Sequence, residues 1–274
     1  MKRYALLVLK GSVVLAFLIL SCSRKAPPYW PENGAVFEDK VWEIPVADSS
    51  KVLVKENGHW ILPESPRSAS VNLAESAHRK PELKRFRAQL GRVNQEVVYD
   101  RSDAGVEFYR FQKDKVFLLG VTNPDTVKPL TVFDPPLEVW SSDVDAQSGW
   151  RSSEGTARVW DISKSEFLTE EKTRIVRVYR EWGSVLLGLR NRKAVLCDMI
   201  VTQARNIVPG KAQTDSLNEV SSRYKVLMVE GIGPVLEWGI RTRVKEKTGD
   251  EKISSMAIPE MESYMEVTVH NKTG

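Results

Sequence analysis

The sequence predicts a mainly β protein in which an antiparallel meander forms a curved sheet, a half-barrel or a barrel, with one short amphipathic helix. Three observations support this fold class. Apolar and polar residues alternate in many short segments, brief polar turns separate these segments, and one turn is the dipeptide Asn57-Gly58. Alternation buries one face of a strand and leaves the other in water, and Asn-Gly favours a two-residue hairpin.

The first 21 residues have the layout of an export signal. Lys2 and Arg3 precede a short apolar run, and the small residue Ser21 stands directly before Cys22. A charged start, an apolar stretch and a small residue at the cleavage point describe a secretory signal peptide. One alternative is an uncleaved anchor, but Lys10 interrupts the roughly 20 apolar residues that a spanning helix needs. Another is ordinary cleaved export.

The run that ends at Cys22 resembles the signal of bacterial lipoproteins. This resemblance implies a signal peptide at residues 1–21, lipidation of Cys22 by palmitate-type chains, and a lipidated, proline-rich tether at residues 22–35. Stable anchoring needs more than one acyl chain, and lipoproteins carry several. The implied location is the bacterial cell envelope, on the periplasmic or surface face of a membrane.

The charge balance argues against a nucleic-acid partner. The chain has 40 basic and 36 acidic side chains, and Lys2, Arg3 and Lys10 would leave with the signal, so that 37 basic side chains remain. A nearly neutral domain exerts no global attraction on a polyanion. The expected partners are the membrane, through the anchor, and a lipid or an envelope protein. No cofactor is expected.

A β-rich domain is expected over residues 36–246. Its N-terminal part, residues 36–95, contains the apolar run Val41–Ile44 and the hairpin around Asn57-Gly58. The helix is expected over Pro81–Val93, because proline suits a first helical turn and the apolar side chains recur at helical spacing. Packing of this helix against the sheet is the first interpretation, and contact with anionic lipid is the second.

Residues 96–246 are expected to form the meander, followed by a tail at 247–274. We expect turns at residues 181–183 and 190–193, a break at Asp134-Pro135-Pro136, and an edge strand at Met265–Val269. The expected strands are Val106–Phe111, Lys115–Val121, Thr131–Trp140, Gly155–Ile162, Thr173–Arg180, Ser184–Leu189, Ala194–Ala204, Ser221–Glu230 and Pro234–Val244. The eight tryptophans are expected mainly in the core, with a ligand site as the alternative.

The run Val229–Trp238, with its Gly-Ile-Gly-Pro turn, and the passage from Asp134 to Trp140 resemble segments of uncharacterised, β-rich exported bacterial proteins. The resemblance covers residues 127–243. It implies a curved antiparallel sheet related in shape to periplasmic lipid and lipoprotein carriers. The glycines Gly231 and Gly233 have a structural explanation as well, because glycine permits a tight turn with positive φ.

One acidic pattern has the spacing of a calcium-binding loop. Asp143, Asp145 and Gln147 alternate, and Glu154 stands at the twelfth position. However, Ser148 occupies the position where such loops need glycine, and the flanking residues read as strands. We therefore expect an acidic β-turn there and no metal site.

No catalytic constellation is evident in the sequence. Cys197 lies in an apolar strand-like run and is expected to be a buried structural thiol. The histidines His59, His78 and His270 lie in separate segments that look peripheral. The predicted function is therefore non-enzymatic, a binding or envelope-structural role for a membrane-anchored lipoprotein. The alternatives are a periplasmic lipid or lipoprotein carrier with an apolar concavity and, from another class, an envelope hydrolase.

Overall fold

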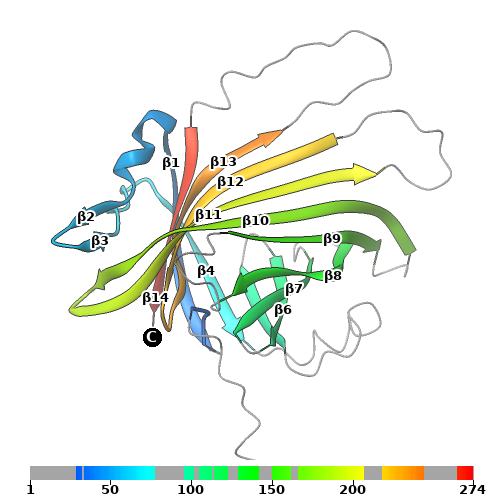
Figure 1. The fold of residues 1–274 in the computed structure, drawn as a ribbon, viewed down its shortest axis with the longest axis horizontal. Coiled ribbons are helices and arrows are strands. Elements are labelled where there is room, and N and C mark those ends of the chain that lie inside the picture. Colours follow the sequence, from blue (N-terminus) through cyan, green and yellow to red (C-terminus); the bar gives the residue numbers. More distant parts are fainter. Residues whose placement is uncertain are drawn as a thin grey trace, which may run out of the picture.

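The computed structural model describes residues 29–32, 34–77, 96–101, 105–112, 114–122, 129–141, 150–161, 166–206, 218–243 and 264–273. Most of these residues are in strands of one curved antiparallel sheet (Figure 1), which confirms the predicted fold class. The strands are β1 (Ala35–Pro45), β2 (Val54–Glu56), β3 (His59–Ile61), β4 (Ser70–Ala77), β5 (Glu96–Arg101), β6 (Gly105–Gln112), β7 (Lys115–Thr122), β8 (Pro129–Ser141), β9 (Trp150–Asp161), β10 (Glu166–Leu187), β11 (Arg190–Asn206), β12 (Asn218–Val229), β13 (Gly233–Arg243) and β14 (Tyr264–Thr273).

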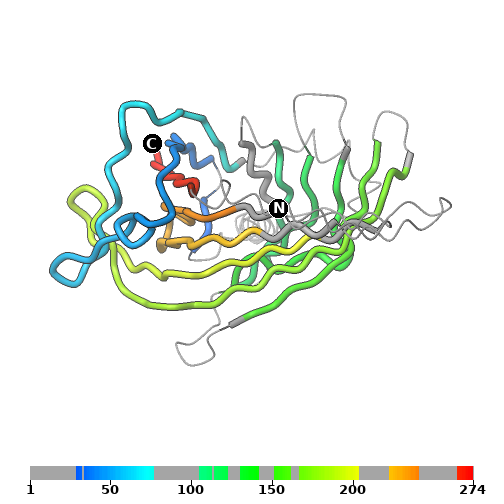
Figure 2. Tube along the Cα trace, turned by 90° about the horizontal axis from the view of Figure 1, so that it is seen from above, coloured from blue at the N-terminus to red at the C-terminus, as the bar shows by residue number. Residues whose placement is uncertain are grey.

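The strand order is β11-β12-β13-β14-β1-β4-β5-β6-β7-β8-β9-β10-β3-β2. Strand β10 also pairs with β11, the strand at the other end of this order, so the sheet curves back on itself. Figure 2 shows this curvature along the Cα trace, with the yellow-green β10 and β11 on one long side. The contact between β3 and β10 is parallel, and the other pairings are antiparallel, as short connections between consecutive strands require. The curved sheet therefore has an inner face that strands distant in the sequence share.

The hairpin predicted at Asn57-Gly58 is confirmed. Strands β2 and β3 pair antiparallel around it, and both turn residues have positive φ, 49° at Asn57 and 84° at Gly58. A two-residue turn with this geometry matches the right-handed twist of the flanking strands, and Asn-Gly adopts it with little strain. The helix expected at Pro81–Val93 lies outside the described residues. Within the described part of the chain, the helical element is the 3₁₀ turn η1 (Val46–Lys51).

Two turns expected within the meander are wrong. Residues 181–183 do not turn, because β10 runs unbroken for 22 residues, and the register with β11 shifts only at Arg180, between Tyr179 and Glu181. Residues 190–193 begin β11, since Leu187 pairs with Arg190 across a two-residue turn at Gly188 and Leu189. Gly188 has a φ of 58°, which glycine adopts freely. The single glycine therefore sets the turn, and the charged residues after it are strand.

The break expected at Asp134-Pro135-Pro136 is a bulge inside β8. The strand continues from Pro129 to Ser141, and its register with β7 shifts between Leu118 and Gly120. Pairing with β9 stops at Asp134, because the next residue is proline and has no N–H to donate. The prolines therefore limit the pairing of β8 with β9 but do not end β8.

The strand expected at Met265–Val269 is present, but it is not an edge strand. Strand β14 pairs with β1 on one side and with β13 on the other, so it lies inside the sheet. Met265, Val267 and Val269 are buried, and the alternation along β14 places them on one face. Strand β14 therefore connects β1, the first strand in the sequence, with β13 in one sheet.

Part of the tether expected at residues 22–35 belongs to the fold, whereas residues 22–28 lie outside the described residues. Tyr29, Trp30 and Pro31 are buried, and Ala35 begins β1. The Tyr29 ring lies 5.5 Å from that of Trp140, and the Trp30 ring lies 4.9 Å from that of Tyr109. Aromatic rings bury large areas, so this short aromatic segment belongs to the core.

The core bears out the prediction for the tryptophans at four positions. Trp30, Trp60, Trp140 and Trp238 are buried in one apolar cluster, and Trp42 and Trp182 pack against it. Pairs of rings at 5–6 Å contribute about 0.5–1.5 kcal/mol beyond their buried area. The Trp140 ring lies 5.6 Å from that of Tyr179, which connects β8 with β10, and Trp30 and Trp140 also border the hollow interior of the sheet.

The close approach of β12 and β13 predicts a large effect for Gly239→Ala. A Cβ on Gly239 would collide with the carbonyl oxygen of Arg223 and lie 2.7 Å from the Cα of Tyr224. Both obstacles are backbone, so one strand must move, and we expect the free energy of unfolding to fall by about 3 kcal/mol. Urea unfolding measures this value.

Gly183→Ala is the matched control. The added Cβ there would meet the side chain of Trp60 at 3.1 Å, and a ring can shift where backbone cannot. We expect a loss of about 1 kcal/mol or less. Equal losses for the two variants would contradict the assigned packing of β12 on β13.

Candidate functional site

The inner face of the curved sheet encloses a cavity of about 310 Å³. Its walls come from strands β6, β7, β8 and β10 to β13, and from the segment before β1. Most of the lining is apolar and includes Leu118, Val121, Phe133, Ile175, Val201 and Met228. Ligand pockets of roughly 300–1,000 Å³ with apolar walls and a few polar groups are typical of small-molecule sites. The cavity lies at the lower end of this range.

The alternation along β10 explains which side chains reach the cavity. Thr173, Ile175, Arg177 and Tyr179 are buried, whereas Arg174 and the other intervening residues point to the opposite face. Successive strand residues point to opposite faces, so the odd-numbered residues of this stretch form one inner row. The row is apolar except at Thr173 and Arg177 and the hydroxyl of Tyr179.

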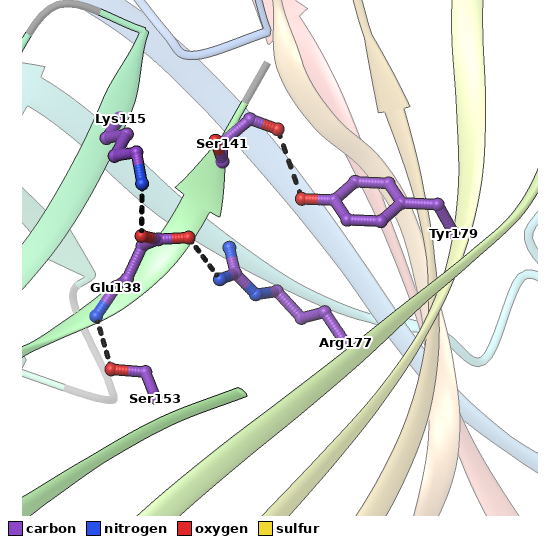
Figure 3. Close-up of polar contacts among 6 residues, drawn as sticks. All are labelled: Lys115, Glu138, Ser141, Ser153, Arg177 and Tyr179. Carbon is purple, nitrogen blue, oxygen red and sulfur yellow. Dashed lines mark hydrogen bonds and ion pairs between the residues drawn. The ribbon is translucent and has the colours of Figure 1, made fainter. Parts of the chain in front are cut away.

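Arg177 is a buried cation in this apolar wall, with only 1 % of its side chain exposed. Its Nη2 donates a hydrogen bond to Glu138 Oε1 at 3.0 Å, and Lys115 Nζ donates to Glu138 Oε2 at 3.0 Å. Figure 3 shows Glu138 between these two cations, and the backbone N–H of Glu138 donates to Ser153 Oγ at 2.8 Å. We call Lys115, Glu138 and Arg177 the Glu138 cluster. It joins β7, β8 and β10 and has a formal charge of +1.

Several polar atoms around the cavity have no hydrogen-bond partner among the described residues. They are Nε and Nη1 of Arg177, the Nε1 atoms of Trp30 and Trp140, and Oγ1 of Thr173. Arginine and tryptophan nitrogens are donors only, and a hydroxyl can donate or accept. Unused donors are therefore part of the polar character of the cavity, beside the carboxylates of Glu107 and Glu237.

Two further titratable groups beside Arg177 stay neutral at physiological pH. Burial raises the pKa of the Tyr179 hydroxyl to about 12, although the Arg177 charge opposes this shift. Burial likewise raises the pKa of the Cys197 thiol to about 12, again against the influence of Arg177. The Tyr179 hydroxyl donates to the carbonyl of Ser141 at 3.1 Å. A thiol held protonated is a poor nucleophile, and Cys197 is buried as predicted.

One histidine, His270, does not lie in the peripheral position expected for it. His270 is buried, and its Nδ1 lies 2.7 Å from Asp39 Oδ1, a contact that joins β14 to β1. Strand pairing created this contact between residues far apart in the chain. His78 lies outside the described residues.

His59 lies against a serine. Its Nδ1 is 2.7 Å from Ser184 Oγ, which brings β3 to β10. A serine nucleophile also needs a group that orients the histidine. Within the described ranges, no further hydrogen bond or ion pair of His59 is seen. The contact therefore serves to hold the β2–β3 hairpin on the sheet.

Of the predicted site residues, Glu154 is the one that the structure describes. Cys22, Asp143 and Asp145 lie outside the described residues, and Glu154 is an exposed residue of β9. Among the described residues there is no group of three or more His, Cys, Asp or Glu side chains that could hold a metal ion. In the same part of the chain, no helix has both the length and the apolarity to cross a bilayer.

Sequence reasoning missed Glu138 and Arg177. One signal was available, because the alternation that buries Ile175 and Tyr179 also assigns Arg177 to the inner face. A charge on the inner row of a strand is rare without a partner. The partner itself could not be read from the sequence, since Glu138 lies 39 residues away on β8.

Fold and site together define a β-rich protein with a curved antiparallel sheet around a mainly apolar cavity that contains buried, unpartnered donors. No protein-family model matches the chain, and no curated protein matches it. One similar solved structure, from Parabacteroides distasonis, is described as a "putative lipoprotein". It is 8 % identical in sequence, with a TM-score of 0.41, and the match covers 91 % of this chain and 99 % of that one.

Proposed function

We propose that this protein is a lipid-anchored envelope protein that binds an acyl chain, or a similar apolar chain, inside its curved sheet and catalyses no reaction. The observation that carries the proposal is the apolar cavity of about 310 Å³ on the inner face. Each methylene moved from water into such a cavity contributes about 0.8 kcal/mol. A chain of several methylenes thus provides the driving force for binding.

The cavity is favoured over a second hollow of about 330 Å³. The lining of that hollow includes Arg180, Asp198 and Lys225, which alternate with the inner residues and so lie on the outer face. Arg180 Nε donates to Asp198 Oδ2 at 2.7 Å, so the two charges already satisfy one another. A more open hollow on the outer face removes less of an apolar chain from water than the inner cavity does.

The chemistry of the inner residues favours binding over catalysis. Cys197 and Tyr179, the nucleophile candidates beside the cavity, both have a pKa of about 12 and stay protonated. Arginine does not release its proton in proteins. The anchor is proposed from the sequence alone: acyl chains on Cys22 would hold the protein at the membrane, where a chain-binding cavity has its ligands.

Filling the cavity tests the proposal. Val201 lines it from β11, and Val201→Trp should weaken binding of decanol, an uncharged single-chain probe, by about tenfold or more, because the indole occupies the space of the ligand. Calorimetric titration of the full-length chain carrying Cys22→Ser measures the affinity. That background removes acyl chains that would compete for the cavity.

Thr202→Trp is the control, since Thr202 is the next residue of β11 and points to the opposite face. It should leave the affinity for decanol within about twofold of the parent. Absence of decanol binding by the parent chain would reject the proposed function. An equal loss of decanol affinity in both tryptophan variants would mean that decanol does not bind at the inner face.

A further inference from the structure

Arg177 is arranged to meet an acceptor that the described part of the chain does not provide. The guanidinium is always charged and has five N–H donors, and Glu138 accepts from Nη2 alone. Nε and Nη1 are buried without a partner among the residues that the structure describes, and the side chain lines the cavity. Leaving such donors unpaired in an apolar site costs more than leaving them in water. A ligand that brings an acceptor to Arg177 removes this cost.

The other unpaired groups at the cavity favour the same kind of ligand. Nε1 of Trp30 and Nε1 of Trp140 are donors only, and Thr173 Oγ1 can donate. An uncharged hydrocarbon would satisfy none of them. A head group with several acceptor oxygens would accept hydrogen bonds from donors that an alkane leaves without a partner.

The acidic groups at the cavity are already engaged. Glu107 Oε2 accepts from the hydroxyl of Tyr109 at 2.5 Å, and Glu237 Oε1 lies 3.7 Å from His270 Nε2. Glu138 is shared by Lys115 and Arg177, which leaves the cluster with a formal charge of +1. A negative head group placed beside Arg177 would balance the excess charge of this cluster, whereas Glu107 and Glu237 line other parts of the cavity wall, on β6 and β13.

We propose that the ligand is a single-chain amphiphile with an anionic head group, such as a carboxylate or a phosphate, whose oxygens accept hydrogen bonds from Arg177 while the chain fills the apolar cavity. This inference rests on the proposed function and adds its ligand class. The small volume favours one chain over two. Charge-assisted hydrogen bonds to a buried guanidinium are about twice as strong as neutral ones, so Arg177 provides selectivity for the anion.

Three probes with the same chain length separate binding of the apolar chain from recognition of the anionic head group. Decanoate, decyl phosphate and decanol are titrated calorimetrically into the full-length Cys22→Ser chain. We expect decanoate or decyl phosphate to bind about tenfold or more tightly than decanol. The tighter of the two anions identifies the head group as a carboxylate or a phosphate. If decanol binds as well as both anions, the inference about the head group is overturned, whereas the proposed function stands.

Arg177→Gln tests the residue itself. Glutamine keeps N–H donors but loses the charge, so the preference of the variant for the two anions over decanol should disappear. Arg174→Gln is the control, because Arg174 lies on the same strand and points to the outer face. An anion preference that survives Arg177→Gln would overturn the assignment of this residue. Should that variant fail to fold, the comparison of probes on the parent chain still decides the ligand class.

Discussion

Replacement of Cys22 by serine should move the protein from the detergent phase to the aqueous phase. The expected change in the ratio between the two phases is about tenfold or more, because the proposed anchor is a set of acyl chains on one sulfur. Each buried methylene contributes about 0.8 kcal/mol, and more than one chain is needed for stable attachment. Serine offers no sulfur for a thioether, so all chains attached there would be lost together. Detergent-phase separation of cell extracts measures the ratio.

Cys197→Ser is the matched control, since Cys197 is the remaining cysteine of the chain and is buried. This variant should stay in the detergent phase. Mass spectrometry of the extracted parent protein should find lipid at residue 22 and no residues 1–21. A mature chain that begins at Met1 with an unmodified Cys22, or a serine variant that partitions like the parent, would rule out the anchor.

Glu138→Ala should destabilise the fold by about 3–5 kcal/mol, the range for removing one partner of a buried ion pair. The substitution leaves the Arg177 charge, 1 % exposed, without its carboxylate, and it also removes the contact with Lys115. The three side chains join β7, β8 and β10, so the loss affects three walls of the cavity together. Chemical unfolding of the full-length Cys22→Ser chain and its Glu138→Ala variant measures the difference.

Two variants make this test specific. Glu154→Ala removes an exposed carboxylate from β9 and should change the free energy of unfolding by about 0.5 kcal/mol or less. Glu138→Ala combined with Arg177→Met should recover part of the lost stability, because no buried charge is then left unpaired. A loss for Glu138→Ala no larger than that for Glu154→Ala would mean that the Glu138 cluster contributes little to stability.

Features that depend on neighbouring residues were predictable from the sequence. The hairpin at Asn57-Gly58 follows from the φ values these two residues tolerate, and the strands of the meander follow from alternation over a few positions. The burial of Cys197 follows from the apolar run around it. In each case the interactions that determine the local structure involve residues close together in the sequence.

Features that depend on register could not be predicted in this way. The residues 181–183 contain a glycine and look like a turn, but Val185 just beyond them is fully buried, and the gain from its burial keeps β10 continuous. The place of β14 between β1 and β13 results from pairing across more than two hundred residues, as in the contact between His270 and Asp39. No local pattern carries that information.

The amino-acid sequence by itself determined that this chain forms a β meander with a buried free thiol, and it carries the pattern from which the anchor at Cys22 is proposed. Tertiary structure alone decided that the inner face leaves a cavity and that Glu138 meets Arg177 there. The physical reason is range: turn geometry and alternation act between neighbours, whereas a cavity and an ion pair exist only after distant strands have paired in one register.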